Sequence, residues 1–155
     1  MPDGAMMSIY EAAQRYRRDA VPLVIVAGHG YGTGSSRDWS AKGVRLLGVR
    51  AIIAESFERI HRANLVAAGV LPLQFAAGET RRTLQLDGSE VFDITGLAGA
   101  LAPAMTLSCG ITRVDGRRDE CDLVARLDTT QEVEYFRHGG ILNYVLRRNC
   151  QPFNP

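Results

Sequence analysis

A glycine-dense stretch, Tyr31-Gly-Thr-Gly-Ser-Ser-Arg-Asp-Trp39, holds the side chains whose types and spacing best suit chemistry. Arg37 offers a guanidinium that grips a carboxylate through two hydrogen bonds, and Ser35 and Ser36 add hydroxyls suited to proton transfer. The stretch follows an apolar run, Val21 to Ala27, that is typical of a buried strand, and it precedes a helical pattern. Its glycines let the backbone approach a ligand, and the helix start presents unpaired N–H groups. We therefore expect an anion site, with a polycarboxylate as the natural ligand.

Two common phosphate motifs do not fit this loop. A dinucleotide fingerprint needs G-x-G-x-x-G, but Thr33 and Ser35 occupy the sixth positions counted from Gly28 and Gly30. A P-loop needs a lysine directly after its last glycine, and none is present there. The remaining alternative to an anion site is a tight turn followed by an ordinary helix N-cap.

The elements around the loop alternate in a way that favours a parallel sheet. Apolar spacing predicts a helix, then strand–helix–strand–helix–strand, over residues 8–19, 21–27, 37–47, 50–54, 57–68 and 70–75. Ser56 is the expected N-cap of the helix over 57–68, and Gly69 is its expected end. The fold class is therefore α/β with a parallel β-α-β core.

The second half of the chain has the pattern of short strands joined by turns. Short alternating runs at Thr83–Leu86 and Val91–Ile94 flank an Asp-Gly turn, and runs at 106–112 and 121–127 flank a second Asp-Gly at 115–116. Thr129 and Glu132 form a capping-box pattern for a final helix, interrupted at Gly139-Gly140. We expect one domain over 1–155, divided into a helix and linker (1–20), a core (21–75), a β-rich section (82–127) and a C-terminal helix (129–149). Residues 2–4, Pro-Asp-Gly, suit a linker between domains as well as a natural start of the chain.

Three blocks at fixed spacing resemble a known family. They are GSSRDW at 34–39, SFERIHRANL at 56–65 and GVLPLQF at 69–75. The chain resembles the C-terminal swivel domain of the aconitase family, in its bacterial aconitase A and iron-regulatory-protein branch. Similar flanks extend from MSIYEAAQRY at 7–16 to YFRHGGILNYVLRR at 135–148. This resemblance implies the swivelling β/β/α fold, which isopropylmalate dehydratase small subunits share.

The resemblance also implies residue roles. Ser35 would be the base that exchanges a substrate proton, while Ser36, Arg37 and Gly34 would bind substrate. A serine must be activated by its surroundings to act as a base, and backbone N–H groups, the helix dipole and Arg37 all favour an alkoxide. In the complete enzyme this would be the hydro-lyase interconversion of citrate and isocitrate through cis-aconitate. The alternative substrate is 2-methylisocitrate or another 2-hydroxy di- or tricarboxylate.

Cofactor and partner expectations follow from what the chain contains. The family holds a [4Fe–4S] cluster through three cysteines on other domains, whereas Cys109, Cys121 and Cys150 form no C-x-x-C pair. Free thiols in a reducing compartment are the simpler interpretation, and we expect no metal ligand in this chain. The cluster and the acid–base Asp–His pairs would come from Fe–S-bearing domains 1–3, covalently attached or as a separate large subunit. The chain would then hold half an active site and be inactive alone.

Other residues have weaker claims to a role at the site. Behind the loop we consider three supporting residues: Arg59, His61 and Asn64. For His61 the alternative is a satisfied, semi-buried histidine, and for Asn64 the role is a hydrogen bond to the loop. Glu55 is expected to pair with Arg50 or Arg59, and Trp39 to pack in the core. Four arginines suggest either a positive rim that attracts polycarboxylates or a solvated face: Arg45, Arg50, Arg59 and Arg62.

Composition narrows the function classes. A net charge of +1 over 155 residues argues against a bulk-electrostatic polyanion binder. RNA binding of the iron-regulatory type remains the alternative function, although basic residues are not interleaved with aromatic ones. No apolar run reaches membrane-spanning length, and the N-terminus lacks the pattern of a signal peptide. A cytoplasmic location is therefore expected.

Overall fold

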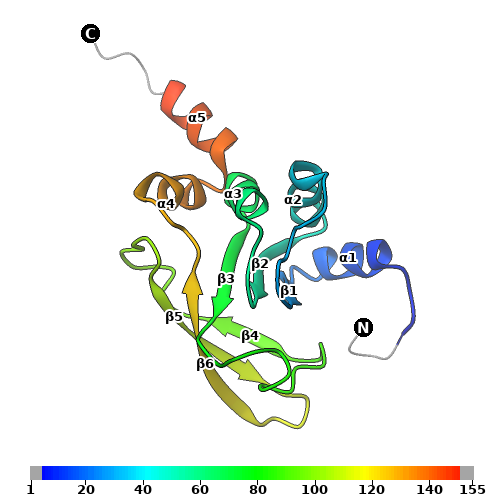
Figure 1. Cartoon of the computed structure of the whole chain (residues 1–155). Coiled ribbons are helices and arrows are strands. Elements are labelled where there is room, and N and C mark those ends of the chain that lie inside the picture. The colour runs from blue at the N-terminus through cyan, green and yellow to red at the C-terminus, as the bar shows by residue number, and fades with distance from the viewer. Residues whose placement is uncertain (1–4, 151–155) are drawn as a thin grey trace.

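A six-stranded mixed sheet forms the centre of the molecule. The computed structural model describes residues 5–150, so the expected linker residues 2–4 lie outside it. The strands are β1 (Leu23–Ala27), β2 (Val49–Ala54), β3 (Leu71–Phe75), β4 (Val91–Ile94), β5 (Thr106–Thr112) and β6 (Arg118–Ala125). Their order is β1-β2-β3-β6-β5-β4, with β1, β2 and β3 parallel and the other pairs antiparallel (Figure 1). The predicted parallel core and β-rich section are thus joined through the pairing of β3 with β6.

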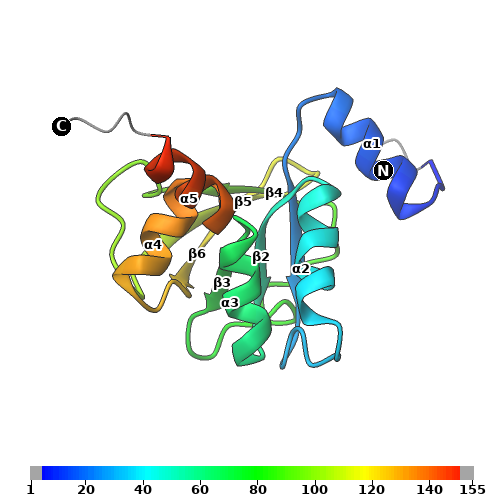
Figure 2. The ribbon, with the colours of Figure 1, turned by 90° about the horizontal axis from the view of Figure 1, so that it is seen from above.

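Five helices accompany this sheet. They are α1 (Ile9–Arg18), α2 (Arg37–Leu46), α3 (Arg59–Ala67), α4 (Thr130–Arg137) and α5 (Ile141–Asn149). Seen from above, α2, α3 and α4 lie side by side, α5 continues from α4, and α1 stands apart near β1 (Figure 2). Within the described residues no helix is long and apolar enough to cross a membrane.

Two apolar clusters fill the two faces of the parallel strands. On the helix side, Val49 and Ile52 of β2 pack with Ala41 of α2 and Leu65 of α3. On the other side, Ile53 and residues of β3 pack with the inward faces of β5 and β6. Burial of the two faces in this way is what holds the loop-bearing edge of the sheet in place.

The helix predictions are largely confirmed, with one correction. A capping box of Ser8 and Glu11 starts α1, within the predicted range 8–19. The prediction that Ser56 caps the next helix is wrong, because α3 begins later and Glu58 is its N-cap. The Ser56 hydroxyl is occupied elsewhere: its Oγ accepts a hydrogen bond from the Gly30 N–H at 2.8 Å.

The β-rich section is confirmed except for its first run. The strands at 91–94 and 106–112 form as predicted, and β5 and β6 form a hairpin around Asp115-Gly116. The strand prediction for 83–86 is wrong. The Thr80 hydroxyl there accepts the N–H groups of Arg82 and Thr83, and Gln85 has a positive φ of 52°, so the chain turns instead.

The C-terminal helix is interrupted at Gly139-Gly140, as predicted. Gly140 has a φ of 119°, and a Cβ there would lie 2.7 Å from the carbonyl oxygen of Ala67. Only half of the predicted capping box forms. The Thr129 hydroxyl accepts the Glu132 N–H, whereas the Glu132 carboxylate accepts the N–H of Asp128 instead of that of Thr129.

Candidate functional site

The glycine-rich loop lies at the carboxyl end of β1 and leads directly into α2. It is held against the segment that follows β2, because the Tyr31 N–H donates to the Ser56 carbonyl at 2.9 Å. The Glu58 N–H in turn donates to the Tyr31 carbonyl at 2.9 Å. The loop therefore has a defined path set by backbone pairing, even though it belongs to neither strand.

A second set of contacts fixes the start of the loop. His29 Nε2 lies 2.9 Å from Glu55 Oε2, and Nδ1 of the same ring lies 3.3 Å from the Ser56 hydroxyl. Glu55 thus pairs with His29, and the expectation that it would pair with Arg50 or Arg59 is wrong. The reason is topological: β1 and β2 run parallel, so the residues that follow them meet at one edge.

His61 supports the loop from beneath. Its side chain is fully buried, and Nδ1 lies 3.0 Å from the carbonyl oxygen of Arg37. Because a carbonyl only accepts, Nδ1 carries the proton, which leaves Nε2 as a buried acceptor without a partner in the described residues. Gly32 lies directly against the ring, since a Cβ there would be 2.2 Å from Cδ2 of His61.

Arg37 is held by one nitrogen only. Its Nε lies 3.2 Å from Oε2 of Glu58, and the side chain is 30% exposed. The same Glu58 carboxylate caps α3 by accepting the His61 N–H at 2.9 Å. That hydrogen bond lowers the pKa of Glu58, and the charges of Arg37 and Arg59 lower it further. Within residues 5–150 the two terminal nitrogens of Arg37 make no hydrogen bond, so their donors are unused.

The two serines are exposed at the start of α2. Ser36 is the N-cap residue by position, but its side chain makes no capping hydrogen bond. Neither hydroxyl has a protein partner in the described part of the chain, and Gly34 beside them is exposed with open space around it. The interpretation as an ordinary N-cap is therefore wrong, because the side-chain hydrogen bond that defines such a cap is missing at Ser36. Two free hydroxyls, free helix amides and the free end of Arg37 together form a donor cluster that suits a carboxylate.

The three proposed supporting residues differ in their positions. His61 touches the loop as described, more deeply buried than the semi-buried alternative supposed. Arg59 is exposed and contributes only its charge near Glu58. Asn64 is partly buried, and no hydrogen bond joins its side chain to the loop within the described residues.

The predicted positive rim does not form. Arg62 is buried, while Arg45 and Arg50 line a cavity at the amino-terminal edge of the strands, away from the loop. The core-packing prediction for Trp39 is also wrong, because its side chain is 74% exposed with the Lys42 ammonium 5.4 Å from the ring centroid. The buried stripe of α2 passes through Ala41 instead, which places Trp39 on the outer surface.

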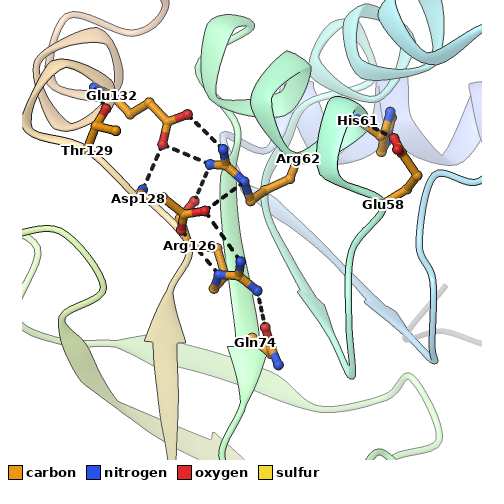
Figure 3. Close-up of polar contacts among 8 residues, drawn as sticks. All are labelled: Glu58, His61, Arg62, Gln74, Arg126, Asp128, Thr129 and Glu132. Carbon is orange, nitrogen blue, oxygen red and sulfur yellow. Dashed lines mark hydrogen bonds and ion pairs between the residues drawn. The ribbon is translucent and has the colours of Figure 1, made fainter.

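Arg62 joins α3 to α4 through a buried clamp (Figure 3). Two of its nitrogens donate to the two carboxylate oxygens of Glu132, each at 2.8 Å, and a third lies 3.2 Å from Asp128. The hydrogen bonds to Glu132 raise the pKa of Arg62. Arg126 extends the network to Asp128 and to the side-chain oxygen of Gln74. The clamp fixes the helix that carries Glu58 and His61.

Sequence reasoning missed Glu58, Gly32 and the Arg62–Glu132 pair. An acidic residue at a helix start was a usable signal for Glu58, since it complements the helix dipole. Nothing local distinguishes Gly32 from its neighbouring glycines, because its role depends on His61, which lies 29 positions away in the chain.

The cysteines do not fit an iron–sulfur cluster. Cys109 and Cys121 are buried partners on β5 and β6, and Cys150 is exposed after α5. The contact with Cys121 and burial raise the pKa of the Cys109 thiol, which opposes the thiolate form that a metal needs. The described residues include no group of three or more His, Cys, Asp or Glu side chains placed to hold a metal ion.

The loop, its buried support and the sheet order match a known family. The family model described as the aconitase C-terminal domain matches residues 1–78, half of the chain, and this span includes all three sequence blocks. The chain belongs to the aconitase C-terminal domain family. The resemblance seen in the sequence is confirmed.

Similar proteins support the same family. The chain is 61% identical over 147 residues to aconitate hydratase A of Pseudomonas aeruginosa, covering 95% of this chain. It is 51% identical over 147 residues to aconitate hydratase A of Escherichia coli K12, again covering 95% of this chain. In both cases the chain spans only 16% of the relative's length.

The fold of this aconitase-family domain also has a solved counterpart. The crystal structure of 3-isopropylmalate dehydratase from Methanocaldococcus jannaschii matches with a TM-score of 0.55 and 21% identity. The match covers 93% of this chain and 80% of that one. The predicted swivelling β/β/α fold is confirmed.

Proposed function

We propose that this chain is the swivel domain or subunit of a hydro-lyase of the aconitate hydratase type. In this proposal Ser35 accepts and returns the proton on the carbon next to a substrate carboxylate, and Ser36, Arg37 and the Gly34 backbone bind that carboxylate. The substrate is citrate or isocitrate, reached through cis-aconitate, with 2-methylisocitrate or a related 2-hydroxy di- or tricarboxylate as the alternative. RNA binding is not part of the proposal, because the chain has a net charge of only +1 and its basic residues are not interleaved with aromatic ones.

The observation that carries the proposal is the donor cluster at the start of α2. The terminal nitrogens of Arg37 lack partners in the described structure, while its Nε makes an ion-pair contact with Glu58 but no hydrogen bond. A guanidinium held at one nitrogen keeps its outer edge free for a bidentate carboxylate contact. The free Ser36 hydroxyl lies next to it in the chain, where it adds a further donor.

Ser35 would act as a base only if its alkoxide is stabilised. The N-terminal end of α2 and the Arg37 guanidinium both favour a negative charge at that position. In the dehydration step the proton would move from the substrate carbon to Ser35 Oγ, the C–H electron pair would form the new C=C bond, and the hydroxyl on the neighbouring carbon would leave as water with a proton from an acid of the other domains. In the hydration step Ser35 would return its proton to carbon, so a complete dehydration and hydration cycle leaves the serine unchanged.

His61 would be a positioning residue for this chemistry. Its Nδ1–H holds the Arg37 carbonyl at the first turn of α2, and Gly32 packs against its ring. Because the ring is fully buried, it fixes the loop and the helix start relative to each other. The backbone of Arg37 is thereby fixed before substrate binds, which reduces the conformational freedom that binding would cost.

The remaining groups of the active site would belong to the rest of a longer protein. The residues of this chain do not fit the [4Fe–4S] cluster that the family uses, so in the proposal domains 1–3 or a separate large subunit hold it. The isolated chain would then be inactive. A cytoplasmic location belongs to the same proposal, supported by the free thiols of Cys109 and Cys121.

Complementation tests this proposal. The chain is mixed with a cluster-loaded fragment of an aconitate hydratase A that lacks this domain, and cis-aconitate absorbance is followed after isocitrate is added. We expect activity that requires both parts and is lost with Ser35→Ala but kept with Ser40→Ala, an exposed serine in the first turns of α2. Activity that survives Ser35→Ala, or a folded chain that gives no activity with an intact cluster, would overturn the proposal.

A further inference from the structure

A cavity of about 420 Å³ lies at the amino-terminal edge of the parallel strands. Its walls include Leu23 of β1, Leu71 of β3, Phe92 of β4 and Phe136 of α4. The Ser35–Arg37 loop leaves the opposite end of β1, so the length of that strand, roughly 13 Å at about 3.3 Å per residue, separates the two places. In Figure 2 the loop lies at the lower edge and the last turn of α2 at the upper edge. The cavity is therefore separate from the proposed active site.

Two arginines stand at this cavity without acidic partners. Arg45, in the last turn of α2, and Arg50, on β2, both line it, and no Asp or Glu does. Neither guanidinium has an ion pair or a side-chain hydrogen bond within residues 5–150. By contrast, Arg62 and Arg113 are both held by carboxylates. Arg45 is partly buried and Arg50 is exposed, so two cations without acidic partners stand beside an apolar wall, where an anion can reach them.

An irregularity in β2 gives Arg50 its place. In the pairing with β1, Leu23 faces Val49 and Val24 faces Ala51, so Arg50 is the extra residue of a bulge. The bulge changes the alternation of the strand: Val49 packs on the helix side, whereas Ala51 packs on the opposite side. Without it, Val49 and Ala51 would share one face. Arg50 therefore takes no part in the alternation of β2 side chains between the two faces of the sheet. It lines the cavity instead.

We propose that this cavity binds a small amphipathic organic anion. Its single carboxylate or phosphate head would lie between Arg45 and Arg50, and its apolar body would lie against Phe92, Phe136 and the strand residues. The volume is in the range of small-molecule sites, about 300–1,000 Å³. A polycarboxylate such as citrate would not fit, because its additional charges would meet the apolar wall without partners. The inference does not depend on the proposed hydro-lyase function.

Two probes of the same size separate charge from apolar contact. The 155-residue chain, labelled with ¹⁵N, is titrated with 2-naphthoate and, as the uncharged counterpart, with 2-naphthamide. A parallel titration with 2-naphthyl phosphate tests the other head group. We expect at least one anion to shift the backbone amides near Arg45, Arg50 and Phe92 and to leave those of residues 34–37 unchanged. We expect the amide to bind at least tenfold more weakly than that anion.

Variants then test the arginines. Arg45→Gln and Arg50→Gln together should weaken binding of the anion at least tenfold, while Arg118→Gln, an exposed arginine on β6, should leave it unchanged. Amide spectra that overlay outside the cavity verify that each variant is folded. Equal binding of the anions and the amide, shifts confined to residues 34–37, no binding by either anion, or unchanged affinity in the double variant would each overturn the proposal.

Discussion

Gly32 is expected to be the least replaceable of the loop glycines, and Gly32→Ala tests the support that His61 gives to the loop. At this position φ is +91°, and a Cβ would lie 2.2 Å from Cδ2 and Cγ of His61. Ordinary contacts between carbon atoms are about 3.5–4.0 Å, so the ring has to move by more than about 1 Å. His61 is fully buried, so the ring can move only by displacing the groups packed around it.

Two effects contribute to the loss of stability in Gly32→Ala, and other glycines of the chain allow them to be measured separately. An alanine at positive φ costs about 1–2 kcal/mol through backbone strain, and overpacking a buried site adds about 1–3 kcal/mol. Gly32→Ala should therefore lower the free energy of unfolding by about 2–5 kcal/mol. Gly48 has a φ of +96° but open space around its Cβ position, so Gly48→Ala should cost only the strain of about 1–2 kcal/mol. Gly34, with no positive φ and no neighbour within 4 Å, should tolerate alanine or gain up to about 1 kcal/mol.

Denaturant unfolding followed by circular dichroism measures all three variants. A fourth measurement places Gly32→Ala in a His61→Gly background. Glycine is needed there because the new Cβ would also lie 2.4 Å from Cβ of His61, which alanine would keep, so only His61→Gly removes the clash and leaves the strain. The added cost of Gly32→Ala there should fall to that of Gly48→Ala. If Gly32→Ala and Gly48→Ala destabilise the wild-type chain equally, the close packing of the loop on His61 is refuted.

Two further perturbations probe the groups that hold α3. Arg62→Met should lower the free energy of unfolding by about 3–5 kcal/mol because it leaves the Glu132 carboxylate, which is only 16% exposed, without its cation and with only the Asp128 N–H as a donor. Adding Glu132→Leu should recover part of that loss in the same denaturant assay, and a single variant as stable as wild type would contradict the clamp. The hydrogen bond from the His61 N–H lowers the pKa of the Glu58 carboxyl from its ordinary value of 4.5. The ionised carboxylate therefore stabilises the fold above that pH, and this contribution is lost as the pH falls through the lowered pKa. Stability measured from pH 6 to pH 2 should thus decline less in Glu58→Gln than in wild type, and parallel curves would show that Glu58 has no such role.

Much of the fold followed from local pattern. The helices and strands of the parallel core were predictable because apolar spacing changes between the helical and the strand period, with glycine at the helix ends. The strand predicted at 83–86 was wrong because alternation alone does not distinguish a strand from a turn. Leu84 and Leu86 pack on the core from a turn, and they show the same alternation that a strand would show. Ser56 misled for a related reason: a good capping residue was used by a neighbouring loop instead.

At the candidate site, the donors were predictable and their support was not. Ser35, Ser36 and Arg37 are adjacent in the chain, so their types and the helix that follows them were visible in one segment. Contacts with the loop come from Glu58 and His61, which follow β2. They reach it only because β1 and β2 pair in parallel, which places the residues after both strands at one edge.

By itself, then, the sequence determined the family, the order of the elements and the position of the loop proposed as the reactive site, because each of these depends on neighbouring residues or on motif spacing. The tertiary structure decided which polar groups are used and which remain free. It paired Arg62 with Glu132, His29 with Glu55 and Arg37 with Glu58, and it left Arg45 and Arg50 unpaired at a separate cavity. The physical reason is that an ion pair or a buried hydrogen bond depends on distance in space, and that distance is set by sheet register and helix packing between segments far apart in the chain.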